Sequence, residues 1–196
     1  TRGVRVMASA RPETIHDFGG FPSVLYTLHY DVDGAPELAT QAAKLLADAG
    51  FEVAIDEQRG LDHGAWVPMR HLRPQGDLPV FQVSLPHDID AAGALRLGAA
   101  LAPLREQGVL IVGSGSMTHN LYECRQHIQD PEYAQQFADW VQAAVVRHDV
   151  EGLVDYRRRA PHAQRAHPTE EHYLPLLVAL GASRPDDAAQ FIEGGM

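Results

Sequence analysis

Cysteine is nearly absent from this sequence, since its 196 residues include only Cys124. A single cysteine excludes an internal disulfide, and disulfide frameworks belong to oxidising compartments, so we expect the protein in a reducing cytoplasm. A nucleophilic cysteine needs a base beside it, and the sequence places none next to Cys124. We therefore interpret Cys124 as an ordinary thiol.

Long apolar runs and positive charge are also scarce. No run approaches the ~20 residues of a membrane-spanning helix, and no basic segment precedes an apolar run as it does in a signal peptide. The 16 Lys and Arg residues are outnumbered by 26 Asp and Glu residues, which gives a net charge of −10. Because nucleic-acid binding requires a basic face, we expect neither a nucleic-acid partner nor a membrane partner.

Histidine, in contrast, is abundant, with eleven residues that are candidates for metal ligands or acid–base groups. The length and the 45% hydrophobic content suit one domain, residues 1–196, with a substantial core. The chain begins directly before the strand-like segment Val4–Met7, and Phe191–Met196 ends it without a helix cap or a completed strand. We interpret both ends as cut and expect N-terminal and C-terminal portions to be missing.

Short β-branched segments alternate with helical patterns along the chain. Strand, helix and strand joined by short glycine-ended turns are typical of parallel crossovers, so the predicted fold class is α/β. The predicted strands are Val4–Met7, Glu52–Ile55, Pro79–Leu85 and Val109–Gly113, and the predicted helices are Pro36–Ala49, Asp90–Gln107 and Tyr133–His148.

The first candidate site follows the second predicted strand. A loop there carries His63 to the carboxyl edge of the sheet, where open α/β sheets bind their ligands. A neutral imidazole could exchange a proton or hydrogen-bond a polar substrate atom, with Asp62 or a carbonyl fixing its tautomer. The alternative is a histidine that only ties down the loop.

The second candidate site is the loop Gly113–Asn120, which carries His119. Its succession of small residues allows a tight turn and leaves room for a ligand. A phosphate-binding loop is disfavoured, because no lysine follows and the GxGxxG pattern is absent.

The third candidate site is the segment His167–Pro175. A proline and two glutamates are typical of a helix first turn, so we expect His172 one turn inside a helix whose apolar run, Leu174–Leu180, packs against the sheet. A histidine at that border could ligate a metal. The HExxH pattern of zinc proteases is excluded, because His167 and His172 are five residues apart. Ordinary helix-start polarity explains the segment equally well.

A fourth segment, Thr14–Pro22, combines aromatic residues with a Gly-Gly pair. Phe18 and Phe21 could wall an aromatic pocket. We favour the alternative, in which they anchor the core at the start of a helix bearing Val24, Leu25 and Leu28.

Together these segments resemble the class III extradiol ring-cleaving dioxygenases of the LigB type, most closely the DOPA 4,5-dioxygenase-like branch. They run in the expected order over nearly the whole chain. The matching segments are ETIHDFGGFPSVLY, RGLDHGAWVPM, PVFQVSL, APLREQGVLIVGSGSMTHNL and AHPTEEHYLPLLVALGA.

The resemblance implies a three-layer α/β/α sandwich with a mostly parallel central sheet, in an enzyme of aromatic compound metabolism. It implies a mononuclear non-haem metal, Fe(II) in catalysis with zinc possible in the same site, and insertion of both atoms of O₂ into a catechol-type ring. His119 matches the family's acid–base histidine, and His63 matches a second histidine that hydrogen-bonds oxygen or substrate. His172 matches the C-terminal metal ligand, for which other branches use a glutamate.

The chain departs from the family at its N-terminus. The family's two other metal-binding histidines would precede Thr1, and a lone His172 cannot supply the three ligands that Fe(II) typically needs. We therefore expect the chain as given to be a metal-poor, inactive fragment of an enzyme. Two alternatives remain: a non-catalytic binding or scaffold protein on the same fold, and a metal-dependent hydrolase using His63 and His119. The oligomeric state is left open, with a monomer favoured.

Overall fold

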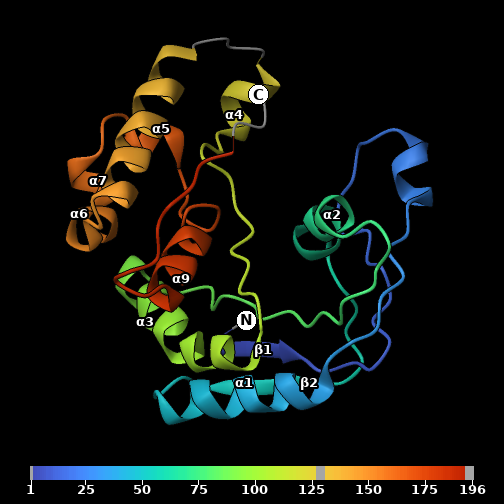
Figure 1. Cartoon of the computed structure of the whole chain (residues 1–196). Coiled ribbons are helices and arrows are strands. Elements are labelled where there is room, and N and C mark those ends of the chain that lie inside the picture. The colour runs from blue at the N-terminus through green and yellow to red at the C-terminus, as the bar shows by residue number, and fades with distance from the viewer. Residues whose placement is uncertain (1, 127–130, 193–196) are drawn as a thin grey trace. The chain divides into compact units, whose positions relative to one another are not determined.

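The structure is a computed structural model that describes residues 2–126 and 131–192 (Figure 1). It is a mixed α/β protein whose chain divides into two compact units, which are described separately below. Unit 1 comprises Thr1–Ile89 and Pro103–Val109, and unit 2 comprises Asp90–Ala102 and Leu110–Met196. The predicted chain end at Phe191–Met196 lies mostly outside the described residues.

Unit 1 is built on a small parallel sheet of two strands, β1 (Val4–Met7) and β2 (Val53–Asp56). Val4 pairs with Val53, and the register runs to Met7 opposite Asp56. Helix α1 (Pro36–Asp48) connects the strands and contacts both. It buries Ala39, Ala42, Ala43 and Leu46, the spacing of one helix face. The first two predicted strands and the first predicted helix are thereby confirmed to within one residue at each end.

The third predicted strand, Pro79–Leu85, is wrong. The chain here lies antiparallel to β1 through one isolated bridge between Val6 and Val83. The Met7 N–H donates to the Gln82 carbonyl and the Ser84 N–H to the Arg5 carbonyl, at 2.8 and 2.9 Å. Prolines at 79 and 86 have no N–H to donate, which limits the length of this pairing.

The fourth predicted strand, Val109–Gly113, is also wrong. The segment has no strand assignment, and the side chains of Leu110 and Val112 are 72% and 49% exposed. Its continuous apolar character suggested a strand covered on both faces. A strand requires a hydrogen-bonded neighbouring strand, and the sheet formed by the described residues contains only β1 and β2.

The rest of unit 1 packs on a small core, with the 3₁₀ segments η1 (Ser23–Thr27) and η2 (Ala102–Gln107) and helix α2 (His63–Leu72). Residue 102 of η2 is assigned to unit 2. The buried core residues are Met7, Tyr30, Val32, Leu61 and Trp66.

Unit 2 is helical in its described part, residues 90–102, 110–126 and 131–192. The helices predicted at Asp90–Gln107 and Tyr133–His148 form as α3, extended by η2, and as α5. Its helices are α3 (Ala91–Leu101), α4 (Leu121–Arg125), α5 (Pro131–Val146), α6 (Val150–Val154), α7 (Tyr156–Arg159), α8 (Ala163–Ala166) and α9 (Leu174–Ala182).

Helices α3 and α9 pack against each other through glycine. A β-carbon at Gly98 would lie 1.9 Å from the Val178 carbonyl oxygen, and one at Gly181 would lie 2.0 Å from that of Leu95. The apolar run of α9 therefore packs against a helix of its own unit. Packing of the same run against the sheet stays a prediction.

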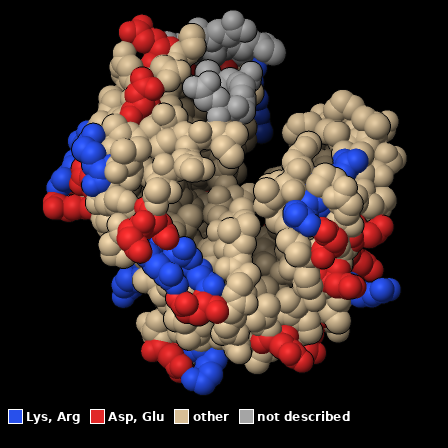
Figure 2. Space-filling model, viewed as in Figure 1, with Lys and Arg blue, Asp and Glu red and all other residues tan. Residues whose placement is uncertain are grey.

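Charged residues on the face shown in Figure 2 are mixed, with Lys and Arg beside Asp and Glu in several small groups. The described ion pairs include Arg5–Asp56 and Arg158–Asp155, at 3.1 and 2.7 Å. Cys124 is exposed on α4, as expected of an ordinary thiol. Among the described helices, none combines the length and the apolar character needed to cross a membrane.

Candidate metal centre

The loop Gly113–Asn120 lies directly against the segment that begins α9. A β-carbon at Gly113 would lie 2.2 Å from the Pro175 carbonyl oxygen, and one at Gly115 would lie 2.4 Å from that of His172. Small residues are needed here because two backbones meet, and the space that we expected for a ligand is filled by residues 172–175. Asn120 ends the loop as the N-cap of α4, where its Oδ1 accepts from the Glu123 N–H at 3.2 Å.

Backbone hydrogen bonds hold this loop beside residues 165–172. The Ser116 N–H donates to the His172 carbonyl at 3.0 Å, and the His119 N–H donates to the Ala166 carbonyl at 2.7 Å. The Asn120 side-chain amide donates to the Arg165 carbonyl at 2.9 Å. These bonds run in sequence along both segments, so they fix the register of His119 against His172.

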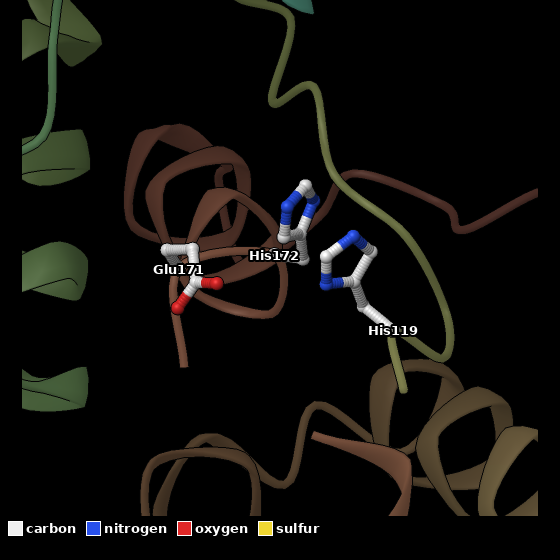
Figure 3. A group of neighbouring side chains, drawn as sticks. All are labelled: His119, Glu171 and His172. Atoms are coloured by element: carbon white, nitrogen blue, oxygen red, sulfur yellow. The ribbon is translucent and has the colours of Figure 1, made fainter. Parts of the chain in front are cut away.

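The two imidazoles that the sequence singled out in unit 2 are in contact. The rings of His119 and His172 stack with their centroids 3.5 Å apart and their planes 24° from parallel. The Glu171 carboxylate joins them, and potential ligand atoms of the three side chains all lie within 4.8 Å of one another (Figure 3). His119 and His172 are partly buried and Glu171 is exposed.

His172 does not lie where the helix pattern placed it. Helix α9 begins at Leu174, so Glu171 and His172 belong to the turn that precedes it, and the prediction of a site one turn inside a helix is wrong. In this turn the two neighbouring side chains can approach one point together with His119. We expected His172 to be the one metal donor of this chain, and in the structure potential donor atoms of His119 and Glu171 lie beside it.

Charge and hydrogen bonding favour the ionised form of Glu171. Burial alone would raise the pKa of this carboxyl. Its pKa nevertheless lies below the ordinary value, because a larger combined opposing effect comes from the Thr169 hydroxyl, the Glu171 backbone N–H and the nearby charge of His172 and His119. The Thr169 hydroxyl donates to Glu171 Oε1 at 2.8 Å. The cluster therefore offers an anionic oxygen beside two imidazoles.

This donor set fits a transition metal. Two histidines and one carboxylate are the protein ligands of the facial triad in non-haem Fe(II) oxygenases, and zinc binds the same donor types. The three residues that could hold such an ion are His119, Glu171 and His172.

His63 lies in unit 1 and is therefore described apart from the cluster. It is the first residue of α2, and both its backbone N–H and its ring Nδ1 bond to Oδ1 of Asp17, at 3.0 and 2.8 Å. A carboxylate only accepts, so Nδ1 carries the proton and Nε2 of the neutral ring is the basic nitrogen. The tautomer is fixed by Asp17. The expectation that Asp62 or a carbonyl does so is wrong, because Nδ1 faces the Asp17 carboxylate. Asp62 instead bonds to Arg59 and Gln82 at 3.2 and 2.7 Å.

The aromatic residues beside His63 divide between core and surface. Phe18 packs partly buried against the core of unit 1 and contacts the His63 ring edge-on, with centroids 5.8 Å apart. Phe21 is 56% exposed. The core interpretation therefore holds for Phe18 and fails for Phe21, which lies before the short 3₁₀ segment η1.

The sequence did not indicate a role in these sites for three residues that the structure places there. Glu171 was interpreted as a helix-start acid, although it directly precedes His172. Asp17 is 46 residues from His63, a separation at which no local pattern links two side chains. The spacing of His167 to His172 excluded the zinc-protease pattern but indicated no other role, and the His167 side chain is fully buried.

The family model "Catalytic LigB subunit of aromatic ring-opening dioxygenase" matches residues 4–194. The chain belongs to this LigB family. The resemblance found in the sequence, including its DOPA 4,5-dioxygenase-like branch, is confirmed.

Relatives within the LigB family are similar over most of this chain. A protein of Beta vulgaris named 4,5-DOPA dioxygenase extradiol is 42% identical over 184 residues, which cover 92% of this chain and 68% of that protein. Its namesake in Escherichia coli K12 is 38% identical over 191 residues, which cover 93% and 68%. A crystal structure of an uncharacterized Escherichia coli K12 protein is 34% identical with a TM-score of 0.75, and the match covers 92% of this chain and 70% of that one.

Proposed function

We propose that this chain carries the metal-binding part of a non-haem extradiol dioxygenase that cleaves a catechol-type ring with O₂. The observation that supports this most is the grouping of His119, Glu171 and His172 in a member of the LigB family. Fe(II) is the proposed catalytic metal, and zinc can take the same donors. When bound, Fe(II) would act as a Lewis acid toward the catechol hydroxyls and supply the redox chemistry that O₂ requires.

Within this proposal, His172 is a metal ligand and Glu171 is its neighbour in the donor set. His119 is proposed as the acid–base residue, since an imidazole can both accept a proton and return it. A ring nitrogen of His119 also lies within 4.8 Å of the potential ligand atoms of Glu171 and His172, so the alternative role of His119 is that of a third metal ligand. The two roles make different predictions for a His119→Ala variant.

His63 is proposed to hydrogen-bond the substrate or oxygen through Nε2. Its bond to Asp17 supports this role because it leaves the basic nitrogen pointing away from the carboxylate. Asp17 would then act through His63 by holding its ring and tautomer.

The same family membership supports several broader proposals. We propose a three-layer α/β/α sandwich with a mostly parallel central sheet, and a single domain over residues 1–196. A cytoplasmic location is proposed from the single cysteine, which excludes an internal disulfide. The relatives from Beta vulgaris and Escherichia coli are named for DOPA, which is a catechol, so DOPA is the first substrate to test.

The test is ring cleavage by iron-loaded protein. The purified chain is loaded with Fe(II) without oxygen, its iron content is measured, and DOPA and simple catechols are offered with O₂. Appearance of a yellow ring-cleavage product, lost in His172→Ala, supports the proposal. His119→Ala should retain iron and lose about 10²–10⁴ in rate if His119 is the acid–base residue. Loss of iron from the same variant would assign it as a ligand.

If the folded, iron-loaded chain cleaves no catechol, the proposal that this chain is catalytic is wrong. The alternatives would then be an inactive fragment of the enzyme or a non-catalytic binding protein. The coverage of 68% of the relatives' length is the observation that favours the fragment. Oxygen-independent hydrolysis would instead favour the hydrolase.

A further inference from the structure

Apart from tyrosine and tryptophan, whose side chains are largely apolar, His167 is the one polar side chain among the buried residues that the structure describes. It lies between α8 and the turn that carries Glu171 and His172. Its ring is enclosed by the rings of Phe137, Tyr173 and Tyr156, at centroid distances of 5.5, 5.6 and 6.4 Å. An imidazole in such surroundings is costly to bury, since each polar atom without a partner loses its hydration.

One nitrogen of this ring is bonded and the other is not. Nε2 lies 2.9 Å from the Met117 carbonyl oxygen and, facing an acceptor, carries the proton. Nδ1 is buried and has no partner among the described residues. Burial lowers the pKa of His167, an effect that the Met117 carbonyl opposes and the nearby His119 and His172 reinforce. A neutral ring with one N–H is the form that this geometry requires.

An apolar side chain would fill this space without leaving Nδ1 unpaired. The imidazole is therefore better explained by the bond that Nε2 makes than by packing. That bond reaches Met117, which lies in the loop Gly113–Asn120 two residues before His119.

The bond belongs to a series that joins this loop to residues 165–172. The backbone bonds Ser116–His172 and His119–Ala166 lie on either side of Met117 along the loop. Between them, the His167 side chain holds the Met117 carbonyl from the core. His119 and His172 each belong to one of these two backbone bonds, and their rings stack with centroids 3.5 Å apart.

We infer that His167 is a positioning residue for the cluster of His119, Glu171 and His172, acting through the Met117 carbonyl. By fixing this carbonyl it holds the loop in the register that places the His119 ring against His172. Outer partners of this kind typically change metal affinity or activity about 10- to 100-fold when they are removed. The role of the cluster in metal binding rests on the proposed function, whereas the positioning of the loop does not.

The test uses two variants with the same chemistry. In His167→Gln the side-chain amide nitrogen falls near the position of Nε2 and can donate to Met117, whereas in His167→Asn it falls near the position of Nδ1 and cannot. Phe137→Leu is the control, because it disturbs the same core without removing a bond to the loop. Circular dichroism and urea unfolding establish that each variant is folded.

The first readout is amide hydrogen exchange at Ser116 and His119, which needs no metal. In His167→Asn these amides should exchange about fivefold to tenfold faster relative to those of α9, the factor expected when one hydrogen bond of ordinary strength is lost. His167→Gln should restore most of the protection. Phe137→Leu should leave the ratio between the loop and α9 unchanged. Equal loop protection in the Gln and Asn variants would overturn the inference.

The second readout is affinity for Co(II), measured by its absorption spectrum in competition with a chelator. Affinity should fall about 10- to 100-fold in His167→Asn and recover in His167→Gln. If the unaltered chain binds no Co(II) while the exchange pattern appears as expected, the metal site fails and the positioning role of His167 stands. If Co(II) binds and the exchange pattern is absent, the positioning role fails alone.

Discussion

Gly98 of α3 faces the backbone carbonyl of Val178 in α9 at a distance that leaves no room for a side chain. A β-carbon there would lie 1.9 Å from the carbonyl oxygen and 3.0 Å from the Ala182 nitrogen. Both neighbours are backbone atoms of a helix, so they cannot move aside independently. The packing of α9, and with it the position of the turn bearing His172, depends on this glycine.

Gly98→Ala should therefore lower the free energy of unfolding, although alanine favours helices. Overpacking a well-filled contact costs about 1–3 kcal/mol, and this outweighs a gain in helix propensity of up to about 1 kcal/mol. Urea unfolding measures the difference. Gly19→Ala is the matched control, since a β-carbon at Gly19 meets nothing within 4 Å. Equal stability of Gly98→Ala and the unaltered protein would show that the two helices are not in this contact.

The metal centre makes a prediction that needs no substrate. His172→Ala removes one of the three proposed donors and should weaken Zn(II) binding by at least tenfold, because the remaining imidazole and carboxylate cannot replace it. Competition with a chromophoric chelator measures the affinity. The control is His148→Asn, at an exposed histidine with φ 51°, a conformation that asparagine tolerates. Equal weakening in both variants would mean that zinc binds the surface and not the cluster.

Local patterns predicted the parts of this fold that are held locally. Helix α1 was correctly placed because its apolar spacing, its proline at the first position and the glycine at 50, with φ 89°, all act within one segment. Val109–Gly113 failed because a strand is defined by its neighbour. Continuous apolar residues describe a segment that should be buried, but they do not supply the partner with which it pairs.

The candidate site divides in the same way. His119 and His172 were identified from the motifs around them, and the structure stacks their rings. Asp17 was missed because its bond to His63 spans 46 residues. The hydrogen bond of His167 to Met117 spans 50 residues, and nothing in the local sequence distinguishes a histidine that donates to a distant carbonyl from one at a surface.

The Asp17–His63 pair predicts a dependence of stability on pH. Burial raises the pKa of Asp17, but the hydrogen bonds from the His63 backbone and ring outweigh this and leave the pKa below its usual value of 3.8. A carboxyl whose pKa is lower in the folded state stabilises the protein above its unfolded pKa of about 3.9, and this contribution is lost as the pH falls through the folded value.

Asp17→Asn should therefore be less stable than the unaltered protein at pH 6, with the difference shrinking as the pH falls below about 4. The effect should be modest, because the Asp17 side chain is 36% exposed. Urea unfolding from pH 6 to pH 3 measures both proteins side by side. A difference that stays constant over this range would show that the carboxylate charge of Asp17 does not contribute.

The last prediction concerns Arg165, whose guanidinium holds α4 to α8. Its Nε and Nη2 donate to the two carboxylate oxygens of Glu123 at 2.8 and 3.1 Å, and the guanidinium lies 4.0 Å from the ring centroid of Tyr133. Lysine keeps the charge but cannot form the two-pronged bond or the planar stack, so Arg165→Lys should cost about 1–2 kcal/mol of unfolding free energy. Lys44→Met is the control, because it removes an exposed pair with Asp48 and should cost at most about 0.5 kcal/mol. If both substitutions have the same small effect in urea unfolding, the geometry of the Arg165–Glu123 pair contributes nothing beyond its charge.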